Sequence, residues 1–216
     1  MATVWMILLM MLGAAAPQDT RTSDFNQKYK DRAVAAAAET LESAASAPYR
    51  YRVHIVNLLQ LKPGMAAAQI GAGSGYVARL IAQRVAPDGK VTATDPDPRM
   101  VAYLNERAKA EAIANLTARV EQPSAAGLDA GSLDAIAVVG RFSTYSRPAD
   151  VLSALTAALK PGGLLLVVDT PHEGQGAAAT GIDADDVIAL ADAAGLDRVD
   201  ENGAVPGHYS LRFRKR

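Results

Sequence analysis

Short apolar runs alternate with amphipathic segments along most of this chain, and this order constrains the fold more than any other feature. From Met65 onward, runs typical of buried strands are separated by segments with apolar residues at helical spacing. We expect strands over residues 65–70, 91–94, 116–120, 133–139 and 164–169, and helices over 77–85, 100–112, 148–159 and 184–194. Strands joined through helices pair in parallel with right-handed crossovers, so the pattern predicts an open α/β sheet with helices on both faces.

The end of the chain departs from this alternation. Residues 196–200 and 209–213 read as two further strands with no helix between them, joined through Asn202-Gly203 and Pro206-Gly207. Strands joined in this way pair antiparallel. The sequence therefore predicts a sheet of five parallel strands followed by a C-terminal antiparallel hairpin.

The residues before the sheet divide into two parts. Residues 4–16 are continuously apolar, which is too short for a bilayer span of roughly 20 residues. The small residues 13–15 fit a signal-peptide cleavage site, although no lysine or arginine precedes Arg21. We expect residues 1–20 to be a signal peptide or short N-terminal anchor and the protein to be periplasmic or secreted. A misassigned start codon or a buried helix, with a cytoplasmic location, is the alternative.

Residues 21–62 are expected to form an N-terminal helical cap. Apolar residues recur at helical spacing over 23–47 and again over 49–61, and Lys62-Pro63-Gly64 ends the second segment. Residues 63–216 then form the main domain.

Composition excludes several kinds of site. The chain has no cysteine, so it has no disulfides, thiolate nucleophiles or cysteine zinc sites. Its histidines, His54, His172 and His208, show no metal-binding spacing, and we predict no metal. A formal charge of −1 without a basic cluster predicts no nucleic-acid surface. We expect no nucleic-acid partner and no membrane span in the mature form; the oligomeric state stays open.

The loop Gly71-Ala72-Gly73-Ser74-Gly75 joins the first expected strand to the following helix. Glycines are needed where the chain turns sharply and a ligand lies against the backbone, and the free N–H groups of the helix point at the same place. The dinucleotide fingerprint would need glycine at position 76, which is Tyr76 here. The loop therefore predicts a nucleoside site and speaks against a nicotinamide-dependent oxidoreductase.

Asp95 is the expected acidic partner of this loop. It lies at the end of the second strand, roughly 20 residues beyond the glycines, where a carboxylate can accept both ribose hydroxyls. The alternative is that Asp95 caps the next helix or begins a turn with Pro96, and Asp97 is equally placed to cap.

These segments resemble the class I S-adenosylmethionine (SAM)-dependent methyltransferases, from about Tyr49 to Arg216. The matching segments are 69–76, 89–100, 131–139 and 159–169, and the ending resembles a bacterial branch of predicted small-molecule methyltransferases. The resemblance implies a Rossmann-like fold, SAM as cofactor and methyl transfer to a small molecule. The cofactor-binding residues that it implies are Gln69, Gly71, Ala72, Gly73, Gly75, Asp95, Pro96, Gln122 and Gly140.

The chain departs from the family pattern at three places. Gln69 replaces the usual acidic residue, and Gln122 takes the place of an aspartate that contacts adenine; neutral amides form weaker hydrogen bonds than carboxylates. Residues 141–145, Arg-Phe-Ser-Thr-Tyr, lack the histidine of that branch. The alternative function is therefore an exported, catalytically silent binding or scaffold protein.

Methyl transfer requires mainly positioning and, for some acceptors, a general base. The substrate should lie beyond the carboxyl ends of the strands. His172 and Glu173 follow the fifth strand and are the candidate base and its orienting partner, and Tyr145 is a candidate for shaping the substrate pocket. A solvated loop histidine and an ordinary core or surface tyrosine are the alternatives.

Overall fold

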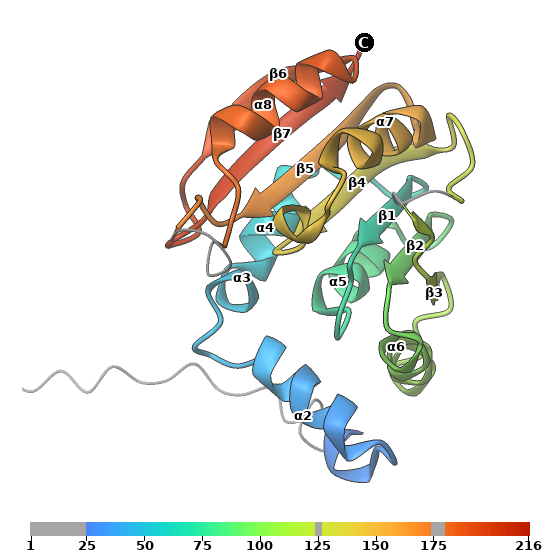
Figure 1. Cartoon of the computed structure of the whole chain (residues 1–216). Helices are drawn as coiled ribbons and strands as arrows, with labels where there is room; N and C mark the ends of the chain where they lie inside the picture. The colour runs from blue at the N-terminus through green and yellow to red at the C-terminus, as the bar shows by residue number, and fades with distance from the viewer. Residues whose placement is uncertain (1–24, 124–126, 174–179) are drawn as a thin grey trace, which may run out of the picture.

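A computed structural model describes residues 25–123, 127–173 and 180–216. It contains a seven-stranded sheet in the order β3-β2-β1-β4-β5-β7-β6 (Figure 1). Neighbouring strands from β1 to β5 pair in parallel, whereas β7 runs antiparallel to both β5 and β6. The predicted fold of five parallel strands and a C-terminal hairpin is confirmed. The strands are β1 (Ala66–Ile70), β2 (Lys90–Asp95), β3 (Leu116–Val120), β4 (Leu133–Val139), β5 (Leu159–Asp169), β6 (Leu196–Asn202) and β7 (Tyr209–Lys215).

Helices cover both faces of the sheet, as the sequence predicted. Side chains of α4 (Arg52–Leu58), α5 (Tyr76–Val85) and α6 (Pro98–Ala110) share one buried cluster. Those of α7 (Pro148–Ala158) and α8 (Ala184–Ala193) share the other. Alternate residues of each central strand enter the two clusters, so β4 is buried at nearly every position. This burial explains the continuous apolar runs of the sequence.

The N-terminal helices differ from their predicted bounds. The helix expected over 23–47 is interrupted: residues 25–28 are helical, and α2 (Arg32–Leu41) starts anew because the Asp31 side chain accepts hydrogen bonds from the backbone N–H groups of Ala33 and Val34. The helix expected over 49–61 is divided into α3 (Ala47–Arg50) and α4. Since α4 shares a buried cluster with β1, it packs into the core of the domain.

Two further differences concern the carboxyl half of the sheet. β5 begins at Leu159, ahead of the Lys-Pro-Gly-Gly turn that was expected to precede it, and the pairing register shifts between Leu133 and Ala135. A short 3₁₀ helix, η2 (Phe142–Thr144), follows β4 and was not predicted. Both features depend on contacts between segments far apart in the sequence: β5 pairs with β4, and Ser143 of η2 binds Asp169. The hydrophobic periodicity of a single segment does not show such contacts.

Residues 1–20 lie outside the described residues, so the signal peptide or anchor stays a prediction. Among the residues that are described, no helix is long and apolar enough to cross a membrane.

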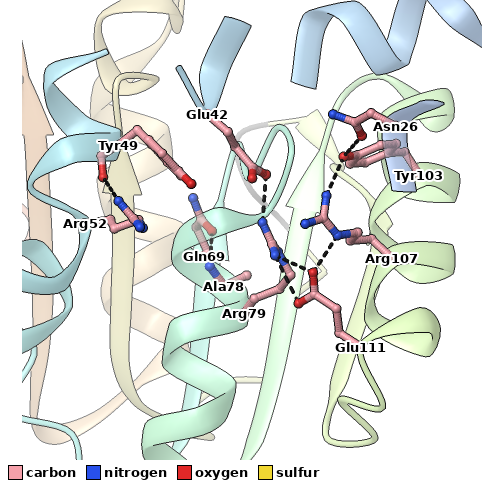
Figure 2. Close-up of polar contacts among 10 residues, drawn as sticks. All are labelled: Asn26, Glu42, Tyr49, Arg52, Gln69, Ala78, Arg79, Tyr103, Arg107 and Glu111. Atoms are coloured by element: carbon pink, nitrogen blue, oxygen red, sulfur yellow. Dashed lines mark hydrogen bonds and ion pairs between the residues drawn. The ribbon is translucent and has the colours of Figure 1, made fainter. Parts of the chain in front are cut away.

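A buried network of charges fastens the end of α2 to the helices of the sheet (Figure 2). Glu42 follows α2 and accepts a hydrogen bond of 2.7 Å from Arg79 of α5. Arg79 also donates to Glu111 at 2.7 Å, and Glu111 accepts from Arg107 of α6 at 2.5 Å. Although burial opposes ionisation, the charges and hydrogen bonds of Arg79 and Arg107 hold the pKa of Glu111 below its ordinary value.

A second attachment lies at the start of the described chain. The hydroxyl of Tyr103 donates to the side-chain oxygen of Asn26 at 2.6 Å, and the rings of Phe25 and Tyr29 lie 5.5 and 5.0 Å from that of Tyr103. Figure 1 shows α2 set apart from the helices that cover the sheet. The two attachments therefore hold α2 in place where few backbone contacts reach it.

Replacing Glu42 with glutamine (E42Q) should lower the free energy of unfolding by about 2 kcal/mol, because a buried arginine loses a charged hydrogen-bond acceptor. Urea denaturation measures this change. Glu39 is exposed on the same helix, and E39Q should shift stability by no more than about 0.5 kcal/mol. Equal effects of the two substitutions would contradict the role given to Glu42.

The stabilisation by Glu111 should depend on pH. A carboxyl group with a lowered native pKa stabilises the fold above its unfolded pKa of about 4.5, and this contribution is lost as the pH falls through the native value. The stability difference between wild type and E111Q should therefore be largest near neutral pH and shrink below about pH 4. Denaturation at a series of pH values tests this, with E106Q, on the exposed side of α6, as the control. A difference independent of pH would contradict it.

Candidate functional site

The loop between β1 and α5 turns through three glycines in the left-handed region. The φ angles of Gly71, Gly73 and Gly75 are +65°, +53° and +76°. Gly75 is the N-cap of α5, so the free N–H groups of that helix begin at the loop. A side chain at these positions costs roughly 1–2 kcal/mol in backbone strain alone. The sharp turn that the glycine spacing predicted is confirmed.

Three separate elements pack against the bare backbone of this loop. A Cβ atom on Gly75 would lie 2.1 Å from Leu104 of α6. On Gly73 it would lie 2.8 Å from Leu41 of α2, and on Gly71 it would lie 2.3 Å from Arg141, which follows β4. Glycine is therefore required by space as well as by conformation, and the loop lies under side chains from α2 and from the segment after β4.

Asp95 lies against the loop, where the sequence placed it. One carboxylate oxygen accepts from the N–H of Gly73 at 2.8 Å, and the other accepts from the N–H of Asp97 at 3.0 Å. Each oxygen keeps a lone pair for a further donor. Capping of α6 falls to Asp97, which accepts from the N–H of Arg99 at 2.8 Å. Asp95 is thus a half-buried acceptor at the edge of the loop, beside the exposed Pro96.

Gln69 is buried beneath the loop, with 2% of its surface exposed. Its side-chain oxygen accepts from the N–H of Ala78 at 2.7 Å, in the first turn of α5 (Figure 2). The amide therefore satisfies one of the free donors at the start of that helix. Its contact with the cofactor stays a prediction.

Glu121 is a carboxylate at the end of β3 that the sequence analysis passed over in favour of Gln122. Glu121 accepts hydrogen bonds from the hydroxyls of Tyr145 at 2.6 Å and Thr94 at 3.4 Å, whereas the side chain of Gln122 is exposed. Burial, together with Glu121, raises the pKa of Tyr145, so this hydroxyl stays protonated and donates. The sequence alone could not show whether Glu121 or Gln122 points into the site, because the two residues are adjacent and both are polar.

The segment after β4 connects Glu121 with the glycine loop. Gly140, in an exposed position, has a φ angle of +62°, and Arg141 follows with its Cζ atom 5.1 Å from the centre of the Tyr145 ring. The buried carboxylate of Asp169, at the end of β5, holds this segment by accepting from the N–H and hydroxyl of Ser143 at 2.9 and 3.0 Å. Arg141 and Tyr145 are thereby fixed above the ends of the central strands.

His172 and Glu173 lie further along this edge, after β5, and both are exposed. The backbone N–H of His172 donates to Asp183 before α8, and the backbone of Glu173 pairs with Thr180. No contact in the described part of the chain joins either residue to Tyr145 or to the glycine loop. Their catalytic role stays a prediction.

The described ranges contain no group of histidine and acidic side chains able to hold a metal ion. The groups that the structure brings together at the carboxyl ends of the strands are the loop glycines, Asp95, Glu121, Arg141 and Tyr145.

Comparisons with known proteins agree with this geometry. The family described as "Methyltransferase domain" matches residues 67–163. A protein-L-isoaspartate O-methyltransferase from Triticum aestivum is 31% identical over 113 residues, which are 50% of this chain and 46% of the relative. A demethylmenaquinone methyltransferase from Thermus thermophilus is 29% identical over 133 residues, 61% of this chain and 59% of the relative. The chain spans about half the length of the first curated relatives that it matches.

The fold is also found in solved structures. A SAM-dependent methyltransferase from Aquifex aeolicus superposes with a TM-score of 0.71 at 19% identity, over 84% of this chain and 98% of that one. The curated relatives named above are methyltransferases, and none of these matches supports the alternative of a silent scaffold. Residues 67–163 therefore match a methyltransferase domain, and the chain has the fold of the SAM-dependent methyltransferases that its sequence resembles.

Proposed function

We propose that this chain transfers the methyl group of SAM to a small-molecule acceptor. The observation that carries this proposal is the left-handed glycine loop with the Asp95 carboxylate bound to its backbone. Both lie at the carboxyl ends of adjacent parallel strands, where open α/β sheets bind their ligands.

The polar groups around the loop are suited to SAM. Asp95 keeps lone pairs for the ribose hydroxyls, and the glycine backbone at Gly71 can receive the methionyl part once the Arg141 side chain that covers it moves. Glu121 has carboxylate lone pairs available for the adenine amino group, and we assign to Glu121 the role that the family pattern first indicated for Gln122. The buried Nε of Arg141 has no hydrogen-bond partner among the described residues, so its N–H group is free to donate to a ligand.

Bound SAM supplies a methyl group on a positively charged sulfur, so the protein mainly has to position the acceptor and exclude water. Tyr145 is placed for this task. Its ring packs edge-on to Phe142 at 6.3 Å, and its hydroxyl is held by Glu121. His172 and Glu173 remain our candidates for accepting a proton from the acceptor.

The acceptor is proposed to be small because the nearly neutral chain has no basic cluster for a nucleic acid. The names of the relatives supply two compounds to test first, demethylmenaquinone and an L-isoaspartyl peptide. We also propose that residues 1–20 direct export, which N-terminal sequencing of protein recovered from the periplasm would test.

Replacing Asp95 with asparagine (D95N) should weaken binding of S-adenosylhomocysteine (SAH) by about tenfold or more, because the ribose loses a charged acceptor. Isothermal titration measures the affinity. D97N, which removes the neighbouring carboxylate charge but keeps a capping oxygen for α6 and leaves Asp95 intact, is the matched control. Equal weakening by both variants, or no binding of SAH to the wild type at millimolar concentration, would count against the proposed site.

Incubation with methyl-labelled SAM and a cell extract should place the label in the low-molecular-weight ultrafiltrate, since the proposed acceptor is a small molecule. The D95N variant should transfer much less label under the same conditions. Label found only in precipitated protein would reject a small-molecule acceptor while leaving methyl transfer intact.

A further inference from the structure

The side chain of Arg141 lies directly on the glycine loop. A Cβ atom on Gly71 would be 2.3 Å from its Cγ and 2.9 Å from both its Cβ and its Cδ. The aliphatic stem of the arginine therefore covers the backbone of the loop instead of extending into solvent. It lies over the residue where the proposed function places the methionyl part of SAM.

The guanidinium group of Arg141 has no counter-charge in the described part of the chain. Its Nε is buried without a hydrogen-bond partner, and the group lies beside Tyr145, near both the ring and the hydroxyl of that residue. The carboxylates at this edge accept from other groups, Asp95 from two backbone N–H groups and Glu121 from two hydroxyls, and neither forms an ion pair with Arg141. Burying part of a cation and leaving one of its donors unpaired costs free energy, which a hydrogen bond to an anion would offset.

We propose that Arg141 binds the carboxylate of the methionyl part of SAM, an inference that rests on the proposed function. That carboxylate is the anionic group of the cofactor, and it belongs to the portion expected on the glycine loop. A guanidinium matches a carboxylate in size and geometry and can donate two parallel hydrogen bonds to it. No position in the sequence pattern assigned this role.

Binding requires the arginine stem to leave Gly71 while its guanidinium stays at the rim of the loop. The backbone around it can remain still, because Asp169 holds Ser143 through two hydrogen bonds. Rotation about the side-chain bonds of Arg141 is then sufficient. The same residue thus covers the loop before binding and pairs with the cofactor afterwards.

The test compares two nucleosides that differ in the amino-acid portion. SAH carries the carboxylate, whereas 5′-methylthioadenosine keeps the adenosine and thioether but lacks it. In R141Q, titration should show SAH affinity lowered by about 10- to 100-fold and methylthioadenosine affinity changed by no more than about threefold. R141K, which keeps the charge without the two-pronged donor geometry, should lie between wild type and R141Q.

Arg147 provides the matched control, because it is an exposed arginine six positions further along the same segment, paired with Asp150. R147Q should leave the ratio of the two affinities unchanged. Equal weakening of both nucleosides in R141Q, or weakening of neither, would overturn the inference even if methylation fell, because Arg141 would then act on the acceptor or on the fold. Failure of the wild type to bind either nucleoside would overturn the proposed function together with it.

Discussion

The left-handed turn at residues 71–75 is the constraint on which the rest of the site depends. Three glycines allow β1 to pass into α5 within a few residues, and no other residue type fits both the φ angles and the surrounding side chains. The turn exposes backbone N–H groups at the edge of the sheet, and Asp95 binds one of them. In the proposed site, cofactor recognition therefore begins with main-chain geometry, and side chains complete it.

A second constraint is the burial of charge beside this turn. Arg79 and Arg107 lie almost wholly inside the protein, and the carboxylates of Glu42 and Glu111 compensate them. Removing either acid would leave a cation in a medium of low dielectric constant. Since Glu42 follows Leu41, the network that satisfies these charges also sets a hydrophobic side chain of α2 on Gly73. The ion pairs that attach α2 to α5 therefore also hold Leu41 over the glycine loop.

Only some residues of the candidate site could be predicted from the sequence. The glycines and Asp95 were found because a motif with a fixed spacing follows a recognisable strand. The contacts of Glu121 and Arg141, on which their proposed roles rest, were not predicted, because they depend on which side chains meet across three neighbouring strands. Gln69 was recognised as unusual, yet its partner, the N–H of Ala78, became known only from the packing of α5 on β1.

The sequence by itself determined the order of strands and helices, the parallel sheet with its terminal hairpin, and the position of the cofactor loop. These properties follow from hydrophobic periodicity and from glycine stereochemistry, which are local. Only the tertiary structure decided the buried charge network beneath α2 and the placement of Arg141 over Gly71. The start of α2 follows from a local cap, Asp31, that hydrophobic periodicity does not show, whereas the joining of Arg79 to Glu42 and Glu111 and the placement of Arg141 depend on contacts between residues 30 to 70 positions apart.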